Sequence, residues 1–343
     1  MSYTRDSSKD LVWDENSNSY VSESAEPTTI AEAIAAAQQR VAAVYTAISN
    51  KGVTLPQTQN LSNMPTAIDS IAIGWTPKKI KNGKVTVSDN KLPDLTGVTE
   101  IDNYVYPYAY FNSWNMTMGV DFRNITKIGT RGCYDMFNGS KVTSANLDSL
   151  STIGESGCQA MFAYTRVTAA SLPSLVTVNE YNACDSMFRG ISYLTSVSLP
   201  ALTTISGPYG LQSIFNSDYN LTSANISIPN LETISGSYGF AYAFQDCTGL
   251  TTFTFPKLST IGQYALAYCF KGCTSLTNIY FSSLTSSSFG ATYKNQFYNM
   301  LQGVTGCTLH FPSSVSSNVQ SLTGYPNFGG TNTVLLFDLP ATS

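Results

Sequence analysis

From about residue 91 onward, the chain repeats one pattern of apolar and polar positions. Each copy has a phenylalanine in a segment of small residues, then a short apolar-polar alternation, and then a junction such as Phe255-Pro-Lys-Leu258. These junctions begin at Leu92, Phe122, Leu147, Leu172, Leu199, Ile228, Phe255 and Phe281, and in degraded form at Phe311. A unit this small cannot bury its apolar face alone, so the pattern predicts a solenoid in which successive copies stack.

Aromatic anchors define the period of the array. They are Phe137, Phe162, Phe188, Phe215, Phe244 and Phe270, and they step by 25, 26, 27, 29 and 26 residues. Leu194, Val197 and Leu199 are expected to point inward from a short strand that ends at a proline, which has no N–H for the ladder. Stacked copies would pair these strands in a parallel sheet, and the phenylalanines, on a helical or turn segment, would fill the other side of the core.

The period and the Leu-Thr-x-hydrophobic-x-Leu-Pro strand resemble the leucine-rich repeats of the BspA type, over roughly residues 91–312. The early copies depart from it with Met-Phe in place of Ala-Phe, and two copies carry the insertions Ser206-Gly-Pro-Tyr209 and Ser235-Gly-Ser-Tyr238. The resemblance implies an α+β repeat solenoid, a leucine-rich-repeat stack of about eight repeats with short parallel strands, and a binding or structural role. Residues 313–343 break the period, and Val334–Leu339 is expected to form a strand of a C-terminal cap that covers the last turn.

The first 27 residues are polar, with Val12, Trp13, Tyr20 and Val21 as the apolar anchors. This composition is typical of a disordered segment, and we interpret it as an attachment tail that a partner chain holds. A helix is predicted after it, because Thr29 and Glu32 fit a capping box and Gly52 fits a left-handed stop.

Apolar residues recur on this helix with alternating steps of four and three. They are Ile30, Ile34, Ala37, Val41, Val44 and Ile48. Such a heptad seam with β-branched residues at both core positions favours a trimeric coiled coil and hence a homo-oligomer. The same stripe also fits a helix that packs on residues 53–75 of its own chain.

Residues 28–90 combine this helix with a small α/β connector and a hairpin. The segments Lys51–Pro56, Leu61–Pro65 and Ile68–Ile71 resemble a short module of bacteriophage tail and fibre proteins, over about residues 40–73. The resemblance implies attachment to other virion proteins through residues 1–75. The Asn82-Gly83 pair between alternating residues predicts the hairpin turn.

Composition narrows the class of partner. Charged residues make up 12% of the chain, about half the usual share of roughly 25%, and the net charge is -4. Such a surface gives no reason to expect a nucleic-acid partner, which requires a basic stripe. The polar N-terminus does not read as a signal peptide, and no stretch is long and apolar enough for a transmembrane segment, so we expect neither export nor membrane insertion.

Candidate chemistry is sparse. The seven cysteines fall at related places in successive copies, as buried free thiols of a core would. His310 is the single histidine, and we expect it to be solvated at an outward strand position. We therefore predict no catalytic, metal or cofactor site. A glycan-acting enzyme would need paired carboxylates in a cleft, and the repeats carry few acids.

Candidate binding residues are those that vary between copies. The outward strand positions form a small, uncharged face that suits a polysaccharide or a flat protein surface, or that is simply solvated sheet; they include Asn146, Ser171, Ser198, Thr254, Tyr280 and His310. Exposed tyrosines give large contact area at low entropic cost, and Tyr209, Tyr219, Tyr238 and Tyr242 lie in or near the inserted loops.

These features favour a non-enzymatic bacteriophage virion protein of the fibre or appendage type. It would be made in the host cytoplasm, anchored in the particle by its N-terminus, and would display its repeats to a host-surface glycan or protein. The alternative is a bacterial surface adhesin or protein-interaction module.

Overall fold

The computed structural model describes residues 95, 97–113, 116–289 and 294–341, and the backbone of three further strands at 11–14, 19–22 and 78–80. The chain divides into two compact units, Met1–Thr76 and Pro77–Ser343. The predicted heptad seam, the phage-like module at residues 40–73 and the Asn82-Gly83 turn lie outside the described residues.

The first unit contains a hairpin where the composition suggested disorder. Strands β1 (Leu11–Asp14) and β2 (Ser19–Ser22) pair antiparallel, with Val12 opposite Val21 and Trp13 opposite Tyr20. These eight residues are therefore paired strands within the segment interpreted as an attachment tail. Apolar and aromatic residues of high β-propensity are concentrated in them, and the polar majority of the segment conceals this local signal.

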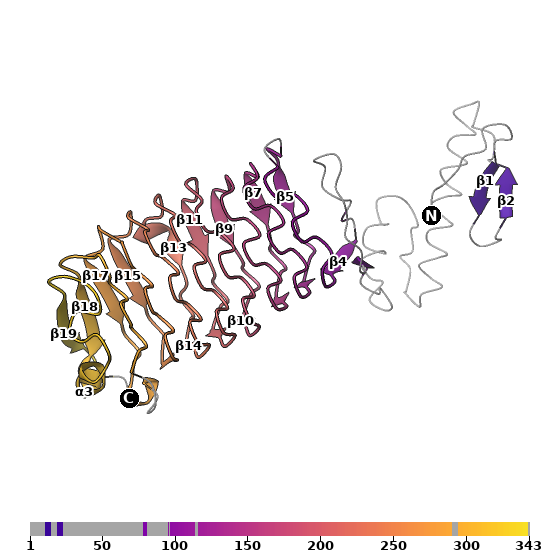
Figure 1. Ribbon diagram of the computed structural model, residues 1–343. Helices are drawn as coiled ribbons and strands as arrows, with labels where there is room; N and C mark the ends of the chain where they lie inside the picture. The colour runs from indigo at the N-terminus through magenta and orange to yellow at the C-terminus, as the bar shows by residue number, and fades with distance from the viewer. Residues whose placement is uncertain are drawn as a thin grey trace, which may run out of the picture. The chain divides into compact units, whose positions relative to one another are not determined.

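The second unit is a parallel β-solenoid of about nine turns (Figure 1), which confirms the predicted stack of short parallel strands. One side, which we call the strand face, carries nine strands of two to six residues in the described part of the chain. They are β5 (Gly119–Asp121), β7 (Ser144–Asn146), β9 (Ala169–Ser171), β11 (Ser196–Ser198), β13 (Ile226–Ser227), β15 (Thr252–Phe255), β17 (Asn278–Phe281), β18 (Thr308–Pro312) and β19 (Val334–Leu339).

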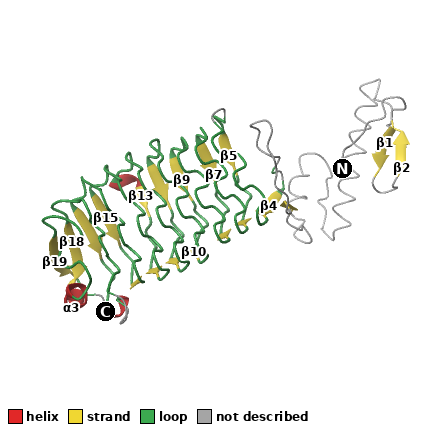
Figure 2. Cartoon of the chain, viewed as in Figure 1, coloured by secondary structure: helices red, strands yellow, loops and turns green. Residues whose placement is uncertain are grey.

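A second side carries strands of two residues, except for the two at its start, which are longer. They are β3 (Lys78–Ile80), β4 (Val98–Ile101), β6 (Lys127–Ile128), β8 (Thr152–Ile153), β10 (Thr177–Val178), β12 (Thr204–Ile205), β14 (Thr233–Ile234) and β16 (Thr260–Ile261). The third side, the turn arc, is a run of tight turns that joins one second-side strand to the next strand of the strand face. Figure 2 shows how few of the described residues are helical: α3 (Ser316–Gln320) and the 3-10 turns η1 (Ser223–Asn225), η2 (Ser286–Ser288) and η3 (Ser313–Val315).

Backbone hydrogen bonds explain why the turn arc repeats so regularly. Alternate N–H groups donate to the next turn of the solenoid, as from Tyr106 to Gly132 O at 2.8 Å, while those between them donate within the turn, as from Ala109 to Tyr106 O. Every fourth residue has a left-handed backbone, for example Tyr238 and Tyr242 with φ near 55°. The segment around each anchor, expected to be helix or turn, is thus a series of turns.

The core confirms the predicted anchors and cysteines. The aromatic rings of Phe137, Phe162, Phe188, Phe215, Phe244 and Phe270 form one continuous stack, with centroids 5.3–6.2 Å apart. All seven cysteines are free and buried. The thiols of Cys247 and Cys273 donate to the carbonyl oxygens of Phe215 and Phe244 in the preceding turn. Burial raises the pKa of Cys273 to about 12, so this thiol stays protonated at neutral pH.

The end of the solenoid matches the predicted cap. Strand β19 pairs parallel with β18, and the ring of Phe337 lies 5.7 Å from that of Phe311. Leu335 and Phe337 are half-buried against the core. The terminal strand therefore covers the last turn, as its alternating apolar residues indicated.

The sheets are interrupted at two places. On the strand face, β5 and β7 form one sheet, β9, β11 and β13 a second, and β15, β17, β18 and β19 a third. On the second side, the sheet is interrupted only between β8 and β10. The boundary between β13 and β15 is thus open on the strand face but continuous on the second side.

Glycines follow the second-side strands where successive turns approach closely. A Cβ added to Gly236 would lie 2.2 Å from the carbonyl oxygen of Gly207. We expect Gly236→Ala to lower the free energy of unfolding by about 1–3 kcal/mol, because two backbones must separate. Chemical denaturation checks this against Ser235→Ala at an exposed neighbour, which should change stability by less than about 0.5 kcal/mol. Equal stabilities of the two variants would contradict the close approach.

Candidate functional site

Strand register brings most of the predicted outward residues into one column on the strand face. Ser171 lies beside Ser198 on neighbouring strands, and Thr254 lies beside Tyr280, which lies beside His310. Asn146 pairs with Asp121, across the first sheet interruption from Ser171. The column also contains Ser227, paired with Ser198, which the sequence analysis missed. Its position just before the Ile228-Pro229 junction was the available signal.

His310 is not the solvated imidazole that its outward position predicted. Its ring stacks on that of Tyr280, with centroids 4.3 Å apart, and only 9% of the residue is exposed. Nδ1 lies 2.9 Å from a carboxylate oxygen of Asp338 on β19, and Nε2 lies 3.1 Å from Oδ1 of Asn278. The terminal strand therefore holds the His310 ring through Asp338, a residue that lies outside the repeats. The imidazole thus connects the cap to the last turns of the solenoid.

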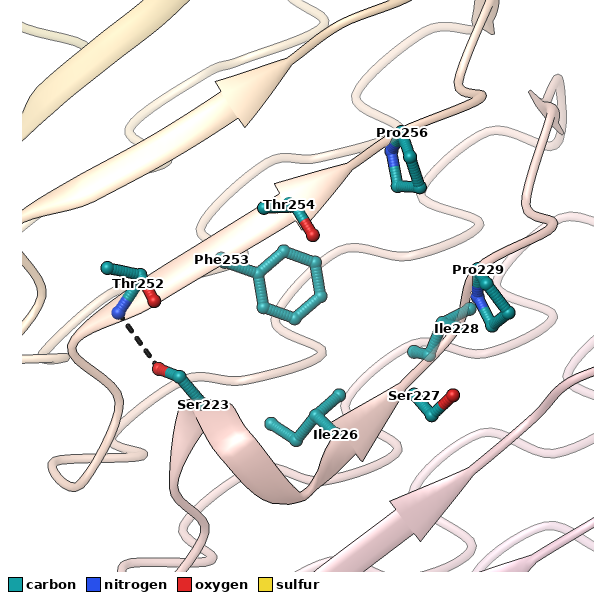
Figure 3. A pocket seen from close by; sticks show the side chains of 9 residues that line it. All are labelled: Ser223, Ile226, Ser227, Ile228, Pro229, Thr252, Phe253, Thr254 and Pro256. Carbon is teal, nitrogen blue, oxygen red and sulfur yellow. Dashed lines mark hydrogen bonds between the residues drawn. The ribbon is translucent and has the colours of Figure 1, made fainter.

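A cleft of about 310 Å³ opens between β13 and β15 (Figure 3). Hydroxyl groups on its walls come from Ser223, Ser227, Thr252 and Thr254. Apolar side chains complete the lining, namely Ile226, Ile228, Pro229, Phe253 and Pro256. Figure 3 shows the Phe253 ring projecting into the gap between the two strands. The cleft therefore combines an apolar floor with an uncharged polar rim.

A second surface lies on the turn arc, where seven tyrosines form a contiguous cluster that we call the tyrosine ridge. Its members are Tyr181, Tyr209, Tyr238, Tyr242, Tyr264, Tyr268 and Tyr298. Tyr238 stacks on Tyr209 and on Tyr264, with centroids 5.3 Å and 4.6 Å away, and Tyr242 stacks on Tyr268 at 4.7 Å. Tyr181 and Tyr298 meet the stacks edge-on.

Backbone geometry alone does not account for these tyrosines. Five of the seven, like Tyr238, have a left-handed backbone, which bulky residues rarely adopt and which costs about 1–2 kcal/mol per residue. In other turns the same place holds residues such as Ser156 and Asn182. Ring stacking contributes about 0.5–1.5 kcal/mol per pair, which is of the same order as this cost. The exposed parts of the rings are available for a role beyond folding.

The tyrosine ridge is neutral and partly exposed. Burial, and then the neighbouring tyrosines, raise the pKa of Tyr238 and of Tyr242 above the usual value near 10, so these phenols stay protonated at neutral pH. The sequence analysis singled out Tyr209, Tyr238 and Tyr242 but placed them in or near inserted loops. In the structure they lie in the turn arc, and the exposed Ser206 and Ser235 take up the extra residues just before it. Tyr219 is 52% exposed and lies outside the ridge.

Three aspartates of the turn arc are buried or half-buried. Burial raises the pKa of Asp185 to about 6, although Ser186 and Gln159 donate hydrogen bonds to its carboxylate. Burial also raises the pKa of Asp218 well above its usual value; its Oδ1 accepts from the N–H of Ile191 at 2.6 Å. The third, Asp135, is 8% exposed, and burial raises its pKa as well. These carboxyls belong to the packed interior and line neither candidate surface.

Other site classes were searched within the described part of the chain. No group of three or more His, Cys, Asp or Glu side chains there is arranged to hold a metal ion. None of the described helices has the length and apolar character needed to cross a membrane.

Comparison with known proteins agrees with this architecture. The family model of the BspA type leucine rich repeat region matches six copies, over residues 99–242 and 211–317. No curated protein matches the chain. Stacked repeats of this kind present extended binding surfaces, which favours surface adhesion or protein-protein interaction over catalysis. Since the matched repeats span more than half of the sequence and coincide with the solenoid, the chain belongs to the BspA-type leucine-rich-repeat family.

Proposed function

We propose that the chain is a non-enzymatic structural protein of a bacteriophage particle, of the fibre or appendage type. Residues 1–75 attach it to other virion proteins, and the solenoid adheres to the host surface. The phage assignment is motivated by the resemblance of residues 40–73 to tail and fibre modules. The heptad positions from Ile30 to Ile48 give it a trimeric stem in this proposal.

The observation that carries the adhesive role is the tyrosine ridge. It offers seven neutral aromatic side chains on one surface, five of them at left-handed backbone positions that bulky residues rarely adopt. Exposed tyrosine is well suited to binding because it buries a large area at low entropic cost. A solenoid also presents such a row without relying on flexible loops.

Adhesion is tested with the full-length chain, labelled with a fluorophore, on intact cells of the host strain. Replacing Tyr209, Tyr238 and Tyr264 together by serine, the residue found at the equivalent Ser156, should weaken cell binding by about tenfold or more. The matched control is Tyr193→Ser, which removes a 49% exposed tyrosine outside the ridge. Equal binding by both variants and the parent chain would overturn the role of the ridge.

The virion assignment has a separate test. Mass spectrometry of purified phage particles should detect the chain, and its absence from particles would overturn the assignment. Light scattering of the full chain and of a form lacking residues 1–52 should give a trimer only for the full chain. Absence from particles combined with ridge-dependent cell binding would instead favour the alternative of a bacterial surface adhesin.

A further inference from the structure

The cleft between β13 and β15 is a gap that the chain maintains by specific contacts. Ser223 is the first residue of the 3-10 turn η1, just before β13, and its Oγ accepts the N–H groups of Thr251 at 3.0 Å and Thr252 at 2.8 Å. Among the described residues, no backbone hydrogen bond joins β13 to β15. On the second side β14 and β16 remain paired, so the solenoid opens on one side only.

Hydrogen bonds cross the gap near both ends of the cleft. Ser223 bridges the two walls at one end through the hydrogen bonds to the following turn. At the other end, the Lys257 ammonium donates to Oδ1 of Asn230 at 2.6 Å. An extended peptide that added a strand would need to enter and leave along the strand direction. A cleft of about 310 Å³ that is bridged at both ends, at the lower end of the range for ligand pockets, suits a compact ligand instead.

The lining defines the chemistry of that ligand. Ile228 and Phe253 are the two most exposed residues of the described hydrophobic core, at 9% and 6%, and both line this cleft. Four hydroxyl side chains surround them, and no lining residue is charged. A complementary ligand is therefore small and neutral, with one apolar face and several hydroxyl groups.

A pyranose ring has this combination of features, since its axial C–H groups form an apolar face and its hydroxyls lie around the edge. We infer that the cleft binds a single neutral pyranose unit of a glycan. The apolar face of the sugar lies against Phe253 and Ile226, where Figure 3 shows both side chains directed into the gap. Its hydroxyls hydrogen-bond with Ser227, Thr252 and Thr254.

This inference stands apart from the proposed function, because the cleft and the tyrosine ridge share no residue and their tests use different variants. The probes are the methyl pyranosides of glucose, galactose and N-acetylglucosamine, and binding to the full chain is followed by saturation-transfer NMR and titration calorimetry. At least one probe is expected to bind the parent chain.

The matched variants place the same bulky ring inside and outside the cleft. Thr254→Trp fills the cleft from β15, whereas Ala169→Trp adds the ring at an exposed position of β9, outside the cleft. Probe binding should fall by about tenfold or more in the first variant and stay within about twofold of the parent in the second. If Thr254→Trp is misfolded by circular dichroism, Ser227→Tyr from the opposite wall replaces it.

Two outcomes would overturn the inference. The first is that none of the three pyranosides binds the parent chain. The second is that a probe binds but the cleft variant retains the affinity of the parent, which moves the sugar to another surface. Neither outcome bears on cell binding by the tyrosine ridge, so failure of this inference and failure of the proposed adhesion are distinguishable.

Discussion

Truncating Phe244 to alanine is expected to lower the free energy of unfolding of the repeat domain by about 3–5 kcal/mol. The side chain is fully buried, and its ring lies between those of Phe215 and Phe270, with centroids 5.5 Å and 5.9 Å away. The centroid of its ring also lies 5.0 Å from that of Phe253, a residue that lines the cleft. The loss combines transfer of the ring to water with a cavity that neighbouring turns can fill only partly, because each turn contacts only its neighbours.

Chemical denaturation followed by circular dichroism measures this loss. The control is Phe111→Ala, which removes a ring that is 45% exposed and should change stability by much less than the core variant. Phe244→Leu should recover part of the loss, since it restores apolar volume. A core variant as stable as the exposed one would mean that the aromatic stack contributes little to holding the turns together.

Stability of the repeat domain is expected to fall as pH rises from about 4 to 6. Burial raises the pKa of Asp185 from 3.8 to about 6, so in this window the folded chain keeps a proton that the unfolded chain has released. Stability is then greatest at low pH and decreases until the folded carboxyl ionises. A shift of this size corresponds to about 3 kcal/mol. Asp218, whose pKa burial also raises, extends the decrease to higher pH.

Asp218→Asn separates this effect from general acid behaviour. The amide keeps an oxygen for the N–H of Ile191 but cannot ionise, so the variant should be more stable than the parent chain by about 1–3 kcal/mol at neutral pH and equal to it near pH 4. Unfolding free energies measured at pH 4.5, 6 and 7.5 check this. Asp148→Asn at an exposed position should leave the pH profile unchanged. Parallel profiles for Asp218→Asn and the parent would contradict the assignment.

The repeating part of the fold is predictable from the sequence because each copy shows the same spacing of apolar residues. Phe188 and Phe244 are anchors at equivalent places, and both lie at the centre of the core. The terminal strand from Val334 to Leu339 is equally visible, since its apolar residues alternate as those of the repeats do. Every turn must bury an apolar face against its neighbours, so the same apolar positions recur in each repeat of the sequence.

The candidate surfaces depend on contacts between turns and are harder to predict. Nothing in Thr222-Ser-Ala-Asn225 marks the break in the strand face, which arises because the Ser223 hydroxyl competes for N–H groups of the next turn. His310 looks solvated until Asp338, 28 residues later, is placed beside it.

The tyrosine ridge shows the same difficulty. Tyr264, Tyr268 and Tyr298 join Tyr209 and Tyr238 only through the register of successive turns. The sequence of one repeat does not show which outward residue of the next repeat will lie beside its own. A row of side chains formed by several repeats therefore cannot be recognised within any one of them. The sequence feature that could have indicated the ridge is the recurrence of tyrosine three or four residues after the second-side strands.

One sheet interruption separates the turn that contains β7 and β8 from the turn that contains β9 and β10. We expect the solenoid to yield first at this boundary under tension. Both sheets stop there, and the backbone bonds across this boundary come mainly from the turn arc, such as Cys158 N–H to Ala183 O. Bonds between adjacent turns share an axial load in parallel, so the boundary with fewest of them carries the most force per bond. We therefore expect the domain to be most compliant at this boundary. There the two sheets can separate while the hydrogen bonds of the turn arc keep the neighbouring turns joined.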